Sequence, residues 1–375
     1  MTLGILKESD GEQRVAITPD AIPGLMKLGF QKVLVERGAG ESAFFSDESY
    51  EKQGAQVADA ATVFKQSNLL VKIHAPEKGL VGQLSAGQVL IGQMNPLIRH
   101  DAVEGMLQAG ITAFSLDLAP RTTRAQALDV LSSMATVGGY KAVLTAANHL
   151  PTFFPMFMTA AGTIKPAKVL ILGAGVAGLQ AIATSRRLGA VVEVFDTRPA
   201  VKEEVMSLGA KFIEVEGAAD ASKAGGYAVE QSEEFMKRQK AKIAESVAKA
   251  DIVITTAQIP GRKAPILITT DMLNSMKNGS VIIDLAAATG GNTEQTKNNE
   301  TVLYKGVRIV GNSNLPSTMP SDASKLYGKN ILNFLQLIIT KEGQLNLNFD
   351  DDLVLGTCIT DKQQVIHNRV KELIN

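Results

Sequence analysis

The feature that most constrains the fold is a glycine-rich turn between an apolar run and a helix-like segment. The turn reads Gly173-Ala174-Gly175-Val176-Ala177-Gly178. It follows the apolar run 168–172 and precedes a second apolar run, 191–195, which ends at Asp196. This order predicts a strand, a tight turn, a helix and a second strand parallel to the first, as in a dinucleotide-binding βαβ unit.

Each part of this unit can contribute to binding a dinucleotide. The first glycine permits the turn, the second lets the backbone approach a pyrophosphate, and the third lets the helix pack against the strand. The N-terminus of the helix offers N–H groups and a positive dipole end to phosphates. A carboxylate at Asp196 can accept from both ribose hydroxyls. The alternative is a turn that only packs a helix on a sheet, but the two strands and the acid favour a nucleotide site. The expected cofactor-binding residues of this unit are Gly173, Gly175, Val176, Ala177, Gly178 and Asp196.

Length and composition limit the class of protein. At 375 residues, 45% of them hydrophobic, the chain suits two domains with sizeable cores. Basic and acidic residues balance at 38 each, which argues against nucleic acid or an anionic membrane surface as a partner. The single cysteine, Cys358, has no internal partner, and no Cys/His cluster has metal spacing, so we expect no metal. Without a signal peptide or a membrane-spanning run, we expect a soluble, cytoplasmic chain.

Short apolar runs alternate with amphipathic segments, which favours parallel sheets covered by helices. In the first third we expect strands at 3–6, 32–35, 69–73, 89–91 and 111–116 and helices at 20–28, 59–66 and 101–109, each helix with an Asp near its start as a possible cap. Further on we expect helices at 124–150, 232–250 and 322–340, strands at 211–215, 252–256, 281–285 and 308–310, and a surface loop at 216–226.

The predicted fold class is therefore α/β, with two Rossmann-like, doubly wound parallel-sheet domains joined by long helices. The first domain would comprise residues 1–138 and be completed by residues 325–375. The second would be the nucleotide-binding domain, residues 139–324.

A second motif, at residues 121–133, contains several polar side chains. If a helix begins near Arg124, then Gln126, Asp129 and Ser132 or Ser133 fall on one face. Together with Arg121 they would offer a guanidinium, an amide, a carboxylate and a hydroxyl that can orient a carboxamide and a ribose. The alternative is an ordinary surface helix with one polar face.

These motifs together resemble the NAD(H)-binding component of proton-translocating nicotinamide nucleotide transhydrogenase. The resemblance runs from the first strand to the C-terminus and is carried by the segments 14–19, 121–133, 173–181, 196–198, 224–227, 255–261, 280–286 and 356–360. Since no transmembrane helices follow, the chain is similar to the separate alpha-1 subunit of bacteria that divide this enzyme among several polypeptides.

Alanine dehydrogenase is the related family that has to be distinguished. Arg14 and Lys72 stand where that family holds the carboxylate and carbonyl of its substrate. However, Asn95 stands near the place of the catalytic histidine, and Ala287 and Ala288 stand where the catalytic aspartate is expected. Because an amino-acid dehydrogenase needs proton acceptors, Arg14 and Lys72 are interpreted as structural remnants or salt-bridge partners.

The resemblance implies a role for each site residue. Asp196 would hold the adenosine ribose and repel a 2′-phosphate, and Arg121, Gln126, Asp129 and Ser132 would orient the nicotinamide. Gln126 is the residue expected to touch both nicotinamide rings. The implied catalytic set is Arg121, Gln126, Asp129, Ser132 and Tyr227, and the implied cofactor-binding set adds Leu131, Thr197, Arg198, Gly226, Gln239, Ala257 and Gln258, with Gly226, Tyr227 and Gln239 in a loop that closes over NAD(H).

The resemblance also implies partners. NADP(H) would be held by a beta subunit, and the proton would cross the membrane in other subunits. The chain would form a homodimer and sit peripherally on the cytoplasmic face of the inner membrane, without inserting into it. The implied activity is that of a Re/Si-specific, proton-translocating NAD(P)+ transhydrogenase subunit. An alanine-dehydrogenase-like enzyme and a non-catalytic NAD-binding module remain the alternatives.

Overall fold

A computed structural model describes residues 1–215, 232–259 and 261–374. The chain forms two compact units, one of Met1–Met134 with Ser317–Asn375 and the other of Ala135–Pro316. One boundary falls inside helix α6 (Val130–His149) and the other inside the short helix η7 (Leu315–Thr318). The limits expected for independent domains, 138/139 and 324/325, remain a prediction.

The first unit is built on an eight-stranded sheet. In sheet order the strands are β17 (Gln364–Val365), β16 (Cys358–Asp361), β6 (Thr112–Ser115), β5 (Val89–Gln93), β4 (Leu69–His74), β1 (Thr2–Ile5), β2 (Lys32–Glu36) and β3 (Gln56–Ala58). The strands from β3 to β6 are parallel, and all of them except the edge strand β3 are almost wholly buried, as apolar runs covered on both faces require. The antiparallel edge strands β16 and β17 were not predicted.

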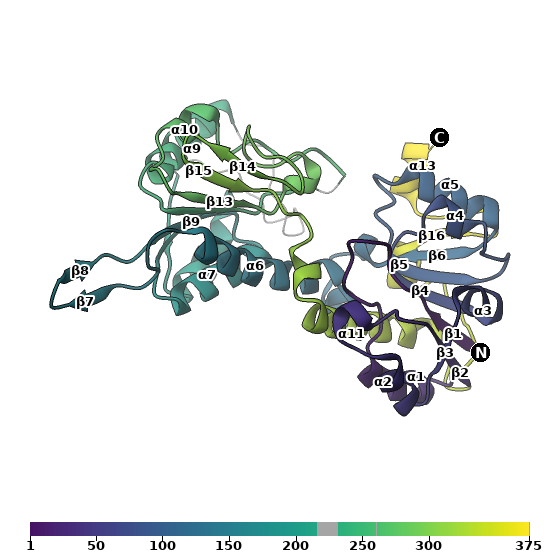
Figure 1. Cartoon of the computed structure of the whole chain (residues 1–375). Helices are drawn as coiled ribbons and strands as arrows, with labels where there is room; N and C mark the ends of the chain where they lie inside the picture. Colours follow the sequence, from purple (N-terminus) through teal and green to yellow (C-terminus); the bar gives the residue numbers. More distant parts are fainter. Residues whose placement is uncertain (216–231, 260, 375) are drawn as a thin grey trace. The chain divides into compact units, whose positions relative to one another are not determined.

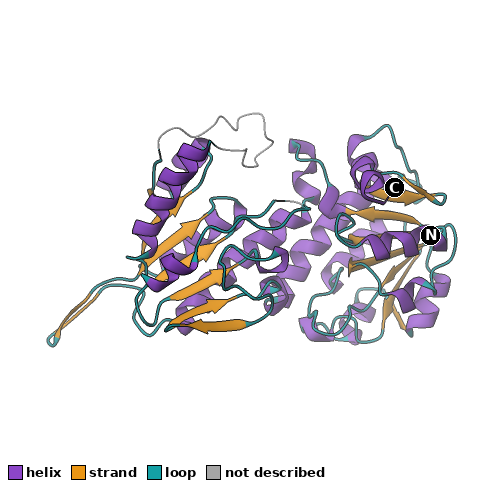
Figure 2. Ribbon diagram, turned by 90° about the horizontal axis from the view of Figure 1, so that it is seen from above, coloured by secondary structure: helices purple, strands orange, loops and turns teal. Residues whose placement is uncertain are grey.

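Helices flank this sheet (Figure 2). They are η1 (Pro19–Ala21), α1 (Ile22–Lys27), η2 (Glu41–Ala43), α2 (Asp47–Lys52), α3 (Ala60–Gln66), α4 (Lys78–Val81), α5 (His100–Ala109), η3 (Leu116–Leu118), η4 (Thr123–Leu128), α11 (Pro320–Ile338), α12 (Asp352–Thr357) and α13 (Asn368–Ile374). Of the three expected caps, Asp59 is confirmed, since it accepts from the N–H of Thr62 at 2.8 Å. The other two are wrong because Asp20 and Asp101 lie inside the first turns of η1 and α5 rather than before them.

The second unit repeats the order of the first five strands. Its sheet runs β11 (Lys211–Phe212), β10 (Val191–Phe195), β9 (Lys168–Leu172), β12 (Ile252–Thr255), β13 (Val281–Asp284), β15 (Val307–Val310) and β14 (Thr301–Tyr304). Counting only the strands of each large sheet in chain order, the third, second, first, fourth and fifth are neighbours in that order, which is the doubly wound arrangement. The predicted fold class is confirmed. The expected strand 211–215 ends early, at Phe212, and β14 is an unpredicted antiparallel edge.

Alternation along the strands explains why helices cover both faces of this second sheet. Val169 and Ile171 pack in one core with α6 and α7 (Val176–Arg187), together with α8 (Lys202–Ser207). Leu170 and Leu172 pack in another core with α9 (Glu233–Val247) and α10 (Thr270–Asn274). Because successive side chains of a strand point to opposite faces, one apolar strand serves both cores. Two short 3-10 helices, η5 (Pro199–Val201) and η6 (Ala287–Thr289), complete the unit.

A two-stranded hairpin, β7 (Phe157–Thr159) and β8 (Gly162–Ile164), extends from the second unit (Figure 1). It was not predicted. Its large apolar side chains are exposed: Phe157 by 41%, Met158 by 74% and Ile164 by 43%. A two-stranded hairpin has little stability of its own, and these side chains form an exposed apolar surface on it. None of the helices in the described part of the chain is both long and apolar enough to cross a membrane.

Candidate nucleotide-binding site

The glycine turn connects β9 to α7 in the second unit, and two of its glycines are required by the packing. Gly173 has a φ of +108°, and a Cβ there would lie 2.3 Å from Thr256 Oγ1. A Cβ on Gly178 would lie 1.9 Å from the carbonyl oxygen of Gly173. At Gly175, by contrast, no described atom outside its chain neighbours lies within 4 Å of the Cβ position. The turn is therefore tight on the protein side and open beside Gly175.

The first turn of α7 presents hydrogen-bond donors at this opening. Gly175 is the N-cap residue and has no side chain to accept from the first N–H groups, which Val176, Ala177 and Gly178 carry. Val176 is 40% exposed. A helix of this length ends in unsatisfied N–H groups and a partial positive charge, so the arrangement suits an anionic group such as a pyrophosphate.

Asp196 lies next to the turn, at the carboxyl end of β10, and its carboxylate is only 6% exposed. Oδ2 accepts from the N–H of Ala174 at 2.7 Å and from Arg198 Nη2 at 2.7 Å. Oδ1 accepts from the N–H and the Nε of Arg198 at 2.8 and 2.9 Å. These four bonds use the normal capacity of a carboxylate, and the hydrogen bond to Asp196 raises the pKa of Arg198.

A pocket of about 280 Å³ opens beside Asp196. The described residues that line it are Phe195, Asp196, Thr197, Pro199, Lys202, Phe212, Glu214, Val215 and Phe235. Aromatic and aliphatic side chains make up much of this lining, with charged groups among them. Lys202 donates to Glu214 Oε1 at 2.6 Å, and both side chains are at least 40% exposed. Of these residues, Asp196 and Thr197 were expected to bind the cofactor. Lys202 and Glu214 were not identified from the sequence, because their proximity depends on how α8 follows β10.

The segment after β12, with Ala257 and Gln258, is fixed by a network that the sequence did not reveal. Asn292 Oδ1 accepts from the N–H of Ala257 at 3.1 Å, and its Nδ2 donates to the Ala257 carbonyl at 2.9 Å. The fully buried carboxylate of Asp284 accepts from the N–H of Asn292 at 2.6 Å. Gln258 Nε2 donates to the carbonyl of Leu285 at 2.6 Å. Because β9, β10 and β12 are adjacent and parallel, these residues share one sheet edge with the glycine turn.

The polar segment 121–133 lies in the first unit. The expected helix start near Arg124 is wrong. Residues 123–128 form the 3-10 helix η4, and α6 begins at Val130. Asp129 is extended and caps α6, since Oδ1 accepts from the N–H of Ser132 at 2.9 Å and Oδ2 from its hydroxyl at 2.6 Å. Aspartate competes for backbone N–H groups and so favours a cap over a helix interior. Instead of one polar helix face, the short 3-10 helix η4 and the long helix α6 meet at Asp129.

The remaining expected residues of this segment differ in exposure. Arg121 and Gln126 are exposed, while Leu131 and Ser132 are partly buried. Arg124 binds Asp351 and Asp352, each at 2.6 Å.

The proposed closing loop falls largely outside the described residues. Gly226 and Tyr227 lie among residues 216–231, which the structure does not describe. Gln239 lies on α9 and is partly buried. The charged segment 232–250 contains α9, which Ser232 caps by accepting from the N–H of Phe235 at 3.2 Å.

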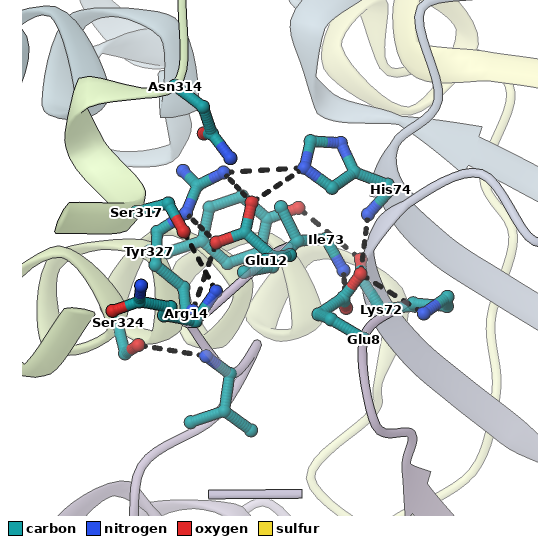
Figure 3. Close-up of polar contacts among 12 residues, drawn as sticks. Glu8, Glu12, Arg14, Lys72, Ile73, His74, Asn314, Ser317, Ser324 and Tyr327 are labelled. Atoms are coloured by element: carbon teal, nitrogen blue, oxygen red, sulfur yellow. Dashed lines mark hydrogen bonds and ion pairs between the residues drawn. The ribbon is translucent and has the colours of Figure 1, made fainter. Parts of the chain in front are cut away.

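Arg14 and Lys72 are salt-bridge partners in the first unit, as interpreted from the sequence (Figure 3). The Arg14 guanidinium makes two bonds to Glu12, at 2.8 and 2.6 Å, and both side chains are 4% exposed. His74 Nε2 also contacts Glu12, at 2.8 Å, and Lys72 Nζ lies 3.1 Å from Glu8. Burial would raise the pKa of Glu12, but the hydrogen bonds from Arg14 and His74 outweigh burial and hold this pKa well below its usual range.

Comparison with known families matches both halves of the chain. The model "Alanine dehydrogenase/PNT, N-terminal domain" matches residues 4–138, and the corresponding C-terminal domain model matches residues 142–368.

Individual proteins are similar over nearly the whole chain. An alpha-subunit chain of the NAD(P) transhydrogenase of Rhodospirillum rubrum is 45% identical, and the match covers 98% of each chain. A crystal structure of transhydrogenase from Sinorhizobium meliloti is 43% identical with a TM-score of 0.86, covering 98% of this chain and 99% of that one. A solved L-alanine dehydrogenase is 25% identical with a TM-score of 0.84, covering 100% of this chain and 99% of that one.

Proposed function

Because the chain belongs to the alanine dehydrogenase/PNT family, we propose that it is the NAD(H)-binding subunit of a proton-translocating, Re/Si-specific NAD(P)+ transhydrogenase. In this proposal a hydride passes directly between NADH held here and NADP+ held on a partner beta subunit. The observation that carries the proposal is its 45% identity to a transhydrogenase alpha subunit along 98% of both chains. The open glycine turn at the end of β9 supports it, since its shape and donors suit a dinucleotide.

We propose that the carboxyl edge of the second sheet holds NAD(H). The N–H groups of Val176 and Ala177 would bind the pyrophosphate beside Gly175. Asp196 would accept from the adenosine ribose, for which at least one of its bonds from Arg198 has to be released, because all its acceptor positions are filled. Thr197 and Arg198 would flank the adenosine. Ala257 and Gln258, which Asn292 and Leu285 hold in place, would contact the nucleotide farther along the edge.

Bound NAD(H) supplies the hydride, and the protein supplies position. Transfer between two nicotinamides needs no general acid or base, so the absence of an acid–base pair at Asn95 and Ala287 fits the reaction. Reacting carbons have to approach to roughly 3–3.5 Å. Arg121, Gln126, Asp129 and Ser132 would orient the nicotinamide, with Leu131 beside them.

We propose that the residues of this group have different roles. Asp129 holds the Ser132 hydroxyl and N–H through its cap, whereas Gln126 is exposed and is proposed to reach both rings. We also propose that Gly226, Tyr227 and Gln239 close over the bound nucleotide.

We further propose that the chain acts as a homodimer with the NADP(H)-binding and membrane subunits. It would lie peripherally on the cytoplasmic face of the inner membrane, and the partners would couple hydride transfer to proton translocation. The exposed apolar hairpin β7–β8 supports a protein contact.

The second candidate function is an alanine-dehydrogenase-like oxidoreductase, which the similarity to a solved L-alanine dehydrogenase favours. The residues argue against it. Asn95 and Ala287 provide no proton acceptor, and Arg14 and Lys72 are each bonded to a buried glutamate. A non-catalytic NAD-binding module is the third candidate.

One mixing experiment separates these functions. The purified chain is incubated with NADH and either pyruvate plus ammonium or a beta-subunit domain loaded with NADP+. Hydride transfer only with the partner domain is expected. Oxidation of NADH by pyruvate and ammonium alone would overturn the proposal, and tight NADH binding without transfer in either mixture would favour the non-catalytic module.

A further inference from the structure

Two acids and one cation meet in the pocket at the end of β10. Among the described lining residues, Lys202 is the only cation, whereas Asp196 and Glu214 are both carboxylates. Lys202 is the first residue of α8 and donates to Glu214 Oε1 at 2.6 Å. A second cation, Arg198, donates to both carboxylate oxygens of Asp196. Each cation is therefore already matched with an acid.

The position of this pocket matters for the choice between two nucleotides. NADP(H) differs from NAD(H) only by a phosphate on the 2′-oxygen of the adenosine ribose. If Asp196 accepts from that ribose, a 2′-phosphate would enter the pocket that Asp196, Lys202 and Glu214 line together. A site that accepts such a phosphate needs a cation available to it, and a repelling carboxylate nearby works in the opposite direction.

We propose that Glu214 is a specificity-determining residue that excludes NADP(H) by engaging Lys202. This inference rests on the proposed function, because it takes the adenosine ribose to lie on Asp196. Glu214 acts in two ways: it removes the cation that a 2′-phosphate would use, and it adds a second negative charge to the pocket. The Lys202 and Glu214 side chains are 40% and 66% exposed. The discrimination against NADP(H) is therefore modest in size, and salt weakens it.

The test measures the dissociation constants of NADH and NADPH for the full chain by nicotinamide fluorescence. In Glu214→Gln, NADPH is expected to bind roughly three- to tenfold more tightly, and NADH within about twofold of the original value. Adding Lys202→Ala to this variant should remove most of the gain, measured against Lys202→Ala alone, because only the smaller effect of the lost carboxylate charge remains. Raising the salt concentration should reduce it. Glu214→Ser, which also frees Lys202, should reproduce it.

A matched control is Glu203→Gln, which removes an exposed acid next to Lys202 that is not among the lining residues. It should leave the NADPH constant within about twofold. The inference is overturned if Glu214→Gln binds NADH but shows no gain for NADPH, if the gain is as large without Lys202 as with it, or if Glu203→Gln produces the same gain. Failure of the unsubstituted chain to bind NADH would instead contradict the proposed function itself.

Discussion

Gly178 packs closely against the carbonyl oxygen of Gly173, and this distance determines how much a substitution at Gly178 should destabilise the chain. A Cβ at position 178 would lie 1.9 Å from the Gly173 carbonyl oxygen. Since a carbon–oxygen contact needs about 3.3 Å, Gly178→Ala has to move α7 by about 1.4 Å relative to β9. A gap of even 1 Å loses about half of the dispersion energy across an interface, and Ala181 and Ile182 of α7 lie fully buried there.

We expect Gly178→Ala to lower the free energy of unfolding by about 2–3 kcal/mol. For a unit of this size the loss corresponds to a decrease in melting temperature of about 4–12 °C. Differential scanning calorimetry without nucleotide measures it. NADH titration should also show weaker binding, because the displaced helix moves the N–H groups that would meet the pyrophosphate.

Gly175→Ala is the matched control, since its Cβ would meet no described atom within 4 Å apart from its chain neighbours. It should cost less than about 1 kcal/mol in stability yet weaken NADH binding, because the methyl group enters the space proposed for the pyrophosphate. An unchanged melting temperature for Gly178→Ala would refute the packing argument. Undiminished NADH binding by Gly175→Ala would refute the placement of the pyrophosphate.

Four further predictions concern other parts of the chain. Gln126→Asn should slow hydride transfer in the reconstituted complex while NADH binding changes little; unchanged turnover would contradict its role. Asp129→Ala should destabilise α6 by about 1 kcal/mol, measured by urea unfolding. Glu12→Gln should cost about 3 kcal/mol at pH 7, because it leaves Arg14 without its buried partner. The lowered pKa of Glu12 means that its stabilisation is present above the ordinary carboxyl pKa of 4.5 and is lost as pH falls, so this deficit should shrink between pH 5 and pH 3, as paired unfolding curves at each pH would reveal. Met158→Ser should weaken a dimer formed through the hairpin, and light scattering that shows the same mass for both chains at every concentration would argue against that surface.

Periodicity and turn chemistry predicted most of the architecture. The βαβ unit around Gly173 was found because its strands are apolar runs and its turn needs glycine, and both signals are local. The start of α6 was missed because helical spacing continues through η4, and only the cap made by Asp129 marks where the α-helix begins.

Other features depend on contacts between residues far apart in the sequence, which short-range sequence patterns do not predict. Asn292 supports Ala257 from a distant loop, and its backbone N–H is in turn held by Asp284. The Lys202–Glu214 pair depends on where β11 ends. The antiparallel strand β16 is short and buried, and its direction follows from its pairing with β6 rather than from its sequence.

That pairing has a consequence for how the chain is made. The second unit is continuous in sequence, but the first is interrupted by it and is finished only when β16 settles beside β6. At a synthesis rate of about 5–20 residues per second, roughly 10–50 s pass between the synthesis of β6 and that of β16. Until then β6 is an open sheet edge, and the core lacks the buried side chains of Ile359 and Val370. The nucleotide-binding unit can therefore fold before the unit that precedes it, which makes the nascent N-terminal sheet the segment most in need of protection from aggregation.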